Sequence, residues 1–120
     1  MNSLNSVLLE GNLTDGPVST HSSEKTPICR FTVESYRFYK AGDGFEKEIS
    51  RFEVETWDRL AQKCTFELTK GRGVRLVGRL KQYDGGVKVI AEHVEFKPVK
   101  EVTPEVEYAE QLKNSGLTPS

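Results

Sequence analysis

Residues 57–80 read WDRLAQKCTFELTKGRGVRLVGRL, a stretch that joins a helix to a strand. In residues 60–68, apolar side chains recur at the spacing of an amphipathic helix. Asp58 is placed to be the N-cap of this helix, and Gly71 stands where a helix usually ends. From Gly73 onward, apolar and basic residues alternate, which is typical of a half-buried strand. The stretch therefore predicts a helix of about ten residues followed by a strand.

Strands are also predicted at the two ends of the domain. The strand that begins at residue 73 extends over residues 73–83, and the tight turn Asp84-Gly85-Gly86 leads into a partner strand over residues 87–96. Near the N-terminus, residues 7–13 read as a buried strand. Gly11 interrupts this strand, which suggests a bulge or a tight bend.

The middle of the chain predicts a hairpin. Residues 28–39 are rich in aromatic and β-branched side chains, and residues 49–57 form the next strand. A turn at residues 41–44 joins the two strands. Residues 14–27 are rich in Thr, Ser, Gly and Pro and are predicted to be a loop.

The element order is therefore strand, strand, strand, helix, strand, strand. Five short strands with one helix between the third and the fourth match the oligonucleotide-binding (OB) barrel, and barrel closure removes exposed strand edges. The sequence predicts an all-β domain with one short helix, a five-stranded OB-fold barrel, over residues 1–99. Another small β-rich fold with one helix is the alternative. Residues 100–120 are predicted to be a flexible acidic tail, and docking of this tail on the barrel as a short helix is the alternative.

The charge is unevenly distributed. The formal net charge is −1. Residues 1–100 contain 16 Lys and Arg against 14 Asp and Glu, a net +2, whereas residues 101–120 contain one Lys against four Glu, a net −3. Only clustering of the basic residues could therefore create an anion-binding surface. Cys29 and Cys64 lie outside any metal-binding spacing, so we expect two reduced thiols, no metal and no cofactor. The sequence lacks a signal-peptide pattern and a membrane-spanning run, which favours a cytoplasmic location.

Several segments, in order along the chain, resemble bacterial single-stranded DNA-binding proteins, the SSB family. They cover roughly residues 5–97 and are Val7-Leu8-Leu9-Glu10-Gly11-Asn12-Leu13 with Gly16-Pro17-Val18, Phe31-Thr32-Val33, Trp57-Asp58-Arg59-Leu60-Ala61, Lys70-Gly71-Arg72-Gly73-Val74 and Leu76-Val77-Gly78-Arg79-Leu80. The resemblance implies an OB-fold protein, not an enzyme, that binds single-stranded DNA without sequence specificity during DNA replication, recombination and repair. It also implies a homotetramer, with a homodimer as the alternative, located in the cytoplasm with the nucleoid.

The chain departs from the family pattern at three places. The family usually has tryptophan at the positions of Tyr39 and Arg51. Bacterial members usually end in a tail with clustered aspartates and an aromatic residue at the tip, whereas this sequence ends in Asn114-Ser115-Gly116-Leu117-Thr118-Pro119-Ser120. The missing tip puts in doubt the recruitment of replication and repair proteins.

Non-specific binding of a single strand requires rings that stack on bases and cations that follow the phosphates. Trp57 is the first stacking candidate, because alternation places it on the same strand face as Glu53 and Glu55, which are expected to be exposed. The candidate rings are Trp57, Tyr39, Tyr83 and Phe52. The candidate cations are Arg37, Lys40, Arg51, Arg72, Arg75, Arg79, Lys81 and Lys88.

Two other functions stay open. The first is an OB-fold primosomal or protein-interaction subunit that binds nucleic acid weakly. The second is an enzyme, but the sequence contains no nucleophile motif, phosphate loop or metal triad that would support one.

Overall fold

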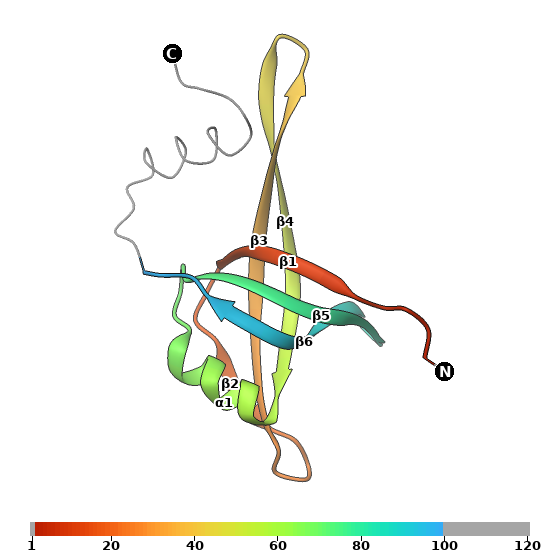
Figure 1. The fold of residues 1–120 in the computed structure, drawn as a ribbon, viewed down its shortest axis with the longest axis vertical. Coiled ribbons are helices and arrows are strands. Elements are labelled where there is room, and N and C mark those ends of the chain that lie inside the picture. The colour runs from red at the N-terminus through yellow and green to blue at the C-terminus, as the bar shows by residue number, and fades with distance from the viewer. Residues whose placement is uncertain (1, 100–120) are drawn as a thin grey trace.

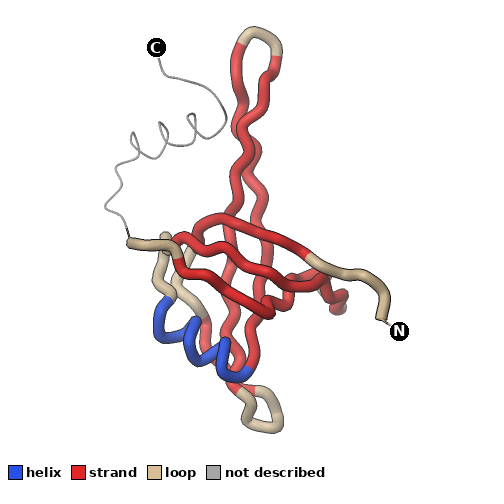
Figure 2. The backbone as a smooth tube through the Cα atoms, viewed as in Figure 1, coloured by secondary structure: helices blue, strands red, loops and turns tan. Residues whose placement is uncertain are grey.

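A computed structural model describes residues 2–99 of the chain. It confirms a β-rich fold with one helix (Figures 1 and 2). The elements are β1 (Val7–Leu13), β2 (Val18–His21), β3 (Pro27–Ala41), β4 (Gly44–Trp57), α1 (Asp58–Glu67), β5 (Gly73–Tyr83) and β6 (Gly86–Phe96).

Five of the strands close into a barrel. The strand order is β1-β5-β6-β4-β3-β2, and an additional pairing of β1 with β3 completes the ring. Neighbouring strands are antiparallel except β4 and β6, which run parallel at Val54 and Glu55. The five-stranded OB-fold barrel predicted from the sequence is therefore confirmed.

The strand β2 lies outside the closed ring, and its presence corrects the prediction of a loop over residues 14–27. It pairs with the first residues of β3, from Val18 opposite Arg30 to His21 opposite Pro27. This edge strand buries little side-chain surface, so its composition carries no apolar alternation. The backbone pairing that forms it cannot be read from the side chains.

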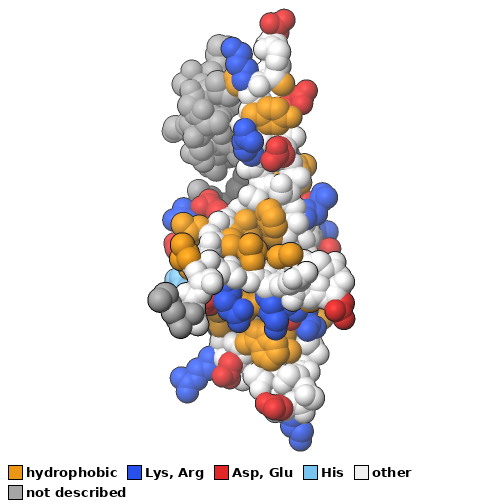
Figure 3. Space-filling model, turned by 90° about the vertical axis from the view of Figure 1, so that its right-hand side faces the viewer, with side chains coloured by type: hydrophobic (Ala, Val, Ile, Leu, Met, Phe, Trp, Pro, Cys, Tyr) orange, Lys and Arg blue, Asp and Glu red, His pale blue; other side chains and the backbone are white. Residues whose placement is uncertain are grey.

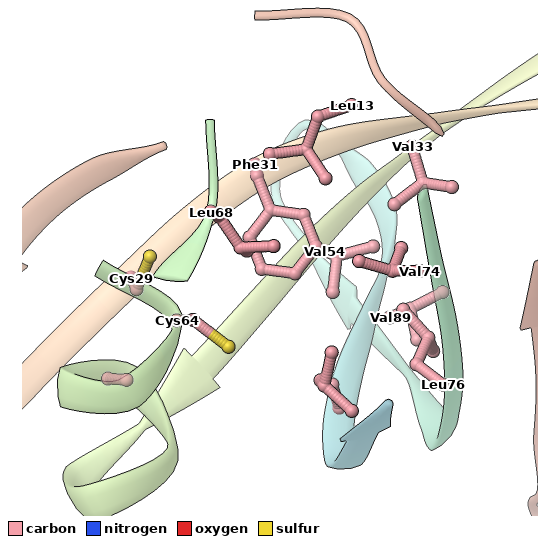
Figure 4. Packing of buried hydrophobic residues seen from close by; sticks show 13 residues of the cluster. Leu13, Cys29, Phe31, Val33, Val54, Cys64, Leu68, Val74, Leu76 and Val89 are labelled. Carbon is pink, nitrogen blue, oxygen red and sulfur yellow. The ribbon is translucent and has the colours of Figure 1, made fainter. Parts of the chain in front are cut away.

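The core fills the barrel and extends to α1. Phe31, Val33, Val54, Val74 and Leu76 point into it from the three strands β3, β4 and β5 (Figure 4). The helix covers one end of the barrel with its buried face, which carries Ala61 and Cys64. Cys29 and Cys64 are both buried free thiols, and burial raises the pKa of Cys64 to about 12.

Gly11 and Gly78 lie at special positions of the strands. Of the bulge or tight bend predicted at Gly11, the bulge is wrong, because β1 keeps an unbroken register with β5 through this residue. A Cβ at Gly11 would lie 2.2 Å from the backbone oxygen of Glu34, so glycine is needed where β3 crosses β1. The bulge lies instead between β5 and β6 at Val77 and Gly78.

The start of the helix also differs from the prediction. Trp57, with extended backbone, is the N-cap residue, and its side chain makes no capping hydrogen bond. Asp58 is the first residue of the helix and has φ 60°, in the left-handed region that aspartate tolerates better than most residues. Asp58 therefore turns the chain sharply from strand to helix instead of capping it.

The hairpin of β3 and β4 extends beyond the barrel (Figure 1). We call residues 35–50 of this hairpin the arm, because there β3 and β4 pair only with each other. The prediction began the second strand at Ile49, but β4 begins at Gly44. This part of β4 was not predicted because residues 46–48 are charged and show no apolar alternation. It is exposed and is held by its pairing with β3.

Candidate functional site

A buried carboxylate organises the outer face of the barrel near the end of β4. The side chain of Glu55 is 1% exposed. Its Oε1 accepts hydrogen bonds from Arg30 Nε at 3.0 Å and from Lys88 Nζ at 3.1 Å, and its Oε2 accepts one from Trp57 Nε1 at 2.8 Å. We call these four residues, from β3, β4 and β6, the Glu55 cluster.

The burial of Glu55 corrects the expectation that both carboxylates on this face are exposed. Burial by itself would raise the pKa of the Glu55 carboxyl, but hydrogen bonds from Trp57, Lys88 and Arg30 outweigh this effect, and the pKa lies below its ordinary value. The ionised carboxylate thus offsets part of the charge of the two cations. Glu53, two residues earlier, is exposed as expected.

Trp57 remains accessible although its indole nitrogen is bound. Its side chain is 38% exposed, and it is not part of the core cluster. An indole whose N–H is satisfied and whose ring is partly open suits a stacking role better than a core role.

Tyr83 lies next to the Glu55 cluster. Lys88 Nζ is 5.1 Å from the centre of the Tyr83 ring, and the Tyr83 hydroxyl donates a hydrogen bond to Glu53 Oε2 at 2.7 Å. This hydrogen bond raises the pKa of the tyrosine. The ring is 38% exposed and lies close to Gly85, where a Cβ would meet it at 2.7 Å. Two predicted rings, Trp57 and Tyr83, are thus linked through Lys88 and Glu55.

The predicted alternation along β5 is confirmed over residues 74–79 and ends at Leu80, which is 47% exposed. Arg75, Arg79 and Lys81 are exposed, while Val74 and Leu76 between the barrel strands are buried. Lys81 lies directly opposite Lys88 and so adds charge beside Tyr83. The other two arginines are engaged by carboxylates. Arg75 binds Glu10 at 2.9 Å, and Arg79 is 3.9 Å from Glu92.

The arm carries predicted residues on both of its faces. Tyr39 and Arg37 share one face, where the Tyr39 hydroxyl donates to Glu46 at 2.9 Å and the Arg37 guanidinium lies 5.5 Å from the ring centre. Lys40 lies on the opposite face, opposite Phe45 in β4. The hydrogen bond to Glu46 raises the pKa of Tyr39.

At the base of the arm, Arg51 and Phe52 point to opposite faces because they are consecutive strand residues. Arg51 Nε donates to Glu34 Oε2 at 3.0 Å. Phe52 is 41% exposed and lies opposite Val33. The structure therefore does not bring these two neighbours into one site.

Arg72 is placed apart from the other candidates. Its Nε donates to the backbone oxygen of Lys97 at 2.7 Å, and its guanidinium lies 6.0 Å from the centre of the Phe96 ring. These contacts tie the residue before β5 to the last residue of β6 and the residue after it.

Sequence reasoning missed two groups of residues. The first is the pair Arg30 and Glu55, which the alternation of β3 and β4 placed on the outer face but which only the register shows to be paired. The second is the face of the arm opposite Tyr39. There Lys47 Nζ lies 4.0 Å from the ring centre of Tyr36, and the exposed apolar side chains are Phe45 and Ile49.

Figure 3 shows hydrophobic and charged side chains side by side along the arm and the barrel on one side of the molecule. In residues 2–99, no group of three or more His, Cys, Asp or Glu is arranged to hold a metal ion. No helix of this part of the chain is long and apolar enough to cross a membrane.

The closed five-stranded barrel with a helix between β4 and β5 defines an OB-fold protein. The crystal structure of a deletion mutant of the single-stranded DNA binding protein from Thermus aquaticus has the same fold. It superposes with a TM-score of 0.71 at 24% sequence identity, over 81% of this chain and 52% of that one.

The pattern of the single-strand binding protein family matches residues 4–96, and the chain belongs to this family. A single-stranded DNA-binding protein of Aquifex aeolicus is 34% identical over 100 residues, which cover 76% of this chain and 68% of the relative. A protein of the same description from Caldanaerobacter subterraneus is 36% identical over 77 residues, 64% of this chain and 51% of the relative. The chain therefore spans only about half to two thirds of the length of these relatives.

Proposed function

We propose that the protein binds single-stranded DNA without sequence specificity and protects it during replication, recombination and repair. The observation that carries this proposal is the pair of exposed rings, Trp57 and Tyr83, fixed beside the cations Arg30, Lys81 and Lys88 on one face of the barrel. Stacked bases contribute about 1–3 kcal/mol each, so a few such rings outweigh the small net charge. The relatives named as single-stranded DNA-binding proteins support the same function.

The arm extends the proposed binding surface. Tyr39 with Arg37, and Lys40 on the other face, would engage the strand beyond the barrel, and Phe52 and Arg51 would continue the path at its base. Ion pairs hold several of the cations. Arg37 is 3.9 Å from Glu48, and Arg51 binds Glu34, so phosphates must displace carboxylates there. We expect the arm to contribute stacking more than charge.

Titration of the protein with a dT oligonucleotide and with a duplex of equal length tests this function. Trp57 is the only tryptophan, so its fluorescence reports binding directly. We expect the single strand to bind far more tightly, with affinity that falls as salt rises because phosphate contacts release counterions. Replacement of Trp57 by Ala should weaken binding by about 1–3 kcal/mol, measured with a labelled oligonucleotide. Equal affinity for single strand and duplex at moderate salt contradicts the proposal.

We also propose that the protein acts as a homotetramer, or as a homodimer, in the cytoplasm with the nucleoid. Leu8, at 79%, and its partner across β1 and β5, Val77, at 37%, are exposed apolar side chains on the outside of the barrel. A second copy of the chain that packs there would remove this surface from water. The molar mass of the wild type and of Leu8→Lys in solution, measured by light scattering, tests the proposed oligomer. A wild type that is monomeric at micromolar concentration contradicts the proposal.

The alternative is an OB-fold primosomal or protein-interaction subunit with weak nucleic-acid binding. The pairing of Arg37, Arg51, Arg75 and Arg79 with carboxylates favours it, because these cations are partly neutralised before any ligand arrives. Under this alternative, the salt dependence of oligonucleotide binding would be shallow. The salt titration therefore separates the two functions.

A further inference from the structure

Glu55 is the only buried carboxylate in residues 2–99. An ionised carboxylate is costly to remove from water unless it is paired and hydrogen-bonded. Here three donors from three different strand positions converge on its two oxygens. A buried charge on the outer face of a barrel adds nothing to the apolar core, so its contacts indicate another role.

The contact to Trp57 fixes the orientation of the indole ring. Trp57 stands at the junction of β4 and α1, outside the core cluster, and Asp58 turns the chain immediately after it. Its Nε1 bond to Glu55 at 2.8 Å therefore favours one orientation of a ring that is 38% exposed. A ring held in place before binding loses less conformational entropy when a base stacks on it.

The contacts to Arg30 and Lys88 differ in exposure. The Lys88 side chain is 15% exposed, so its charge is largely enclosed by Glu55 and the Tyr83 ring. The Arg30 side chain is 43% exposed, and its bond to Glu55 uses Nε. Arg30 can therefore keep the bond to Glu55 while it presents the rest of its guanidinium to a phosphate.

We propose that Glu55 is a positioning residue of the DNA interface, which holds the Trp57 ring to receive a base and the Arg30 guanidinium to receive the neighbouring phosphate. The proposal rests on the proposed function. It predicts that DNA affinity falls when the negative charge of Glu55 is removed. This is the opposite of what simple electrostatics predicts, because a carboxylate beside a phosphate path repels the phosphates. Removal of its charge should strengthen binding if the charge alone matters, and weaken binding if positioning matters.

The experiment compares Glu55→Gln with Glu95→Gln, a variant with the same charge change at an exposed residue of β6, opposite Arg75. Affinity for a labelled dT oligonucleotide is measured by anisotropy. We expect Glu55→Gln to bind about tenfold more weakly and Glu95→Gln to bind equally or slightly more tightly. The time-resolved fluorescence anisotropy of Trp57 in the free protein should decay faster in Glu55→Gln, which a merely structural contribution to stability would not cause.

Trp57→Phe keeps a ring and removes the N–H, and it provides a test if Glu55→Gln does not fold. We expect Trp57→Phe to bind several-fold more weakly, and the double variant to lose less than the sum of the two single losses, because both remove the same contact. If the wild type does not bind the oligonucleotide, the proposed function fails. If the wild type binds and either Trp57→Phe or a folded Glu55→Gln binds equally well, the positioning role is wrong and the function stands.

Discussion

The barrel and the arm are two parts of the same β3–β4 hairpin, yet different forces hold them. Within the barrel, one face of the hairpin packs Phe31, Val33 and Val54 into the core, and the other holds the Glu55 cluster. Beyond the crossing of β1, the two strands of the hairpin pair with no other strand of residues 2–99, and their exposed apolar residues include Phe45, at 51%, and Ile49, at 45%. An isolated two-stranded hairpin is marginally stable in water.

This difference separates two ways of presenting aromatic rings. The barrel holds Trp57 through a hydrogen bond to the buried Glu55, and it holds Tyr83 through an exposed hydrogen bond to Glu53. The arm holds Tyr36 and Tyr39 through exposed contacts with Lys47 and Glu46, which contribute little to stability. The Trp57 ring is therefore held by a buried group, while Tyr83 and the arm rings depend on contacts at the surface.

The largest expected effect is on closure of the barrel. Gly11→Ala places a Cβ 2.2 Å from the Glu34 backbone oxygen and 2.8 Å from Val33, and neither can move without breaking the β1–β3 contact. We expect the free energy of unfolding to fall by more than about 4 kcal/mol, as for severe overpacking. Urea denaturation measures it. Gly44→Ala, in the arm with open space around its Cβ, is the matched control, and a similar loss there would contradict the comparison.

A smaller loss is expected from the core itself. Leu76 is fully buried, so Leu76→Ala should lower the free energy of unfolding by about 3 kcal/mol through lost burial and the cavity it leaves. Ile49→Ala removes an exposed arm side chain and should cost less than about 1 kcal/mol. Thermal unfolding of both variants gives the comparison. Equal losses would show that the arm is packed as firmly as the barrel.

These differences explain what could be predicted from the sequence. Two sequence patterns reflect which side chains are buried: the alternation along Val74, Arg75 and Leu76, and the helical spacing of Ala61 and Cys64. Patterns of this kind were sufficient to predict the barrel. The pattern does not report strand register, which alone brings Arg30 to Glu55. A carboxylate reads as exposed on average, so the buried Glu55 could not be foreseen.

The length of the arm and the role of Gly11 could not be predicted from the sequence for other reasons. The charged residues 46–48 carry no burial signal, although they form a strand with β3. Gly11 was correctly singled out, but a glycine required for the close approach of a distant strand looks the same in the sequence as one in a bulge. The flexible acidic tail predicted over residues 100–120 lies outside the described residues and stays a prediction.

The comparison also predicts a variant that affects binding without affecting stability. Phe45→Ala removes an arm ring that contributes no core contact, so we expect an unchanged melting temperature and a loss of about 1 kcal/mol in affinity for a dT oligonucleotide. Val18→Ala, at an apolar residue of β2 that is 64% exposed, is the control and should change neither. Unchanged affinity in Phe45→Ala would remove the arm from the proposed binding surface.

The smallest expected effect is the change in the free energy of unfolding when a surface ion pair is removed, and this change should depend on pH. Glu10 on β1 accepts hydrogen bonds from Arg75, its cross-strand partner on β5, and from Lys97, which follows β6, and these contacts lower the pKa of its carboxyl. A carboxyl whose pKa is lower in the folded state stabilises the fold above its unfolded pKa, about 4.3, and this contribution disappears as the pH falls through the folded pKa.

Glu10→Gln should therefore lower the free energy of unfolding by less than about 1 kcal/mol at pH 7, as is usual for exposed pairs. The difference from the wild type should shrink below pH 4, where the wild-type carboxyl becomes protonated. Glu48→Gln, in the arm, removes a carboxylate that lies as far as 3.9 Å from Arg37. Because this ion pair is longer than the 2.9 Å pair of Glu10 with Arg75, we expect a smaller effect or none. Urea denaturation of the three proteins at pH 7 and pH 3 measures these differences. A larger loss for Glu48 than for Glu10 would mean that the arm, and not the barrel, depends on its ion pairs.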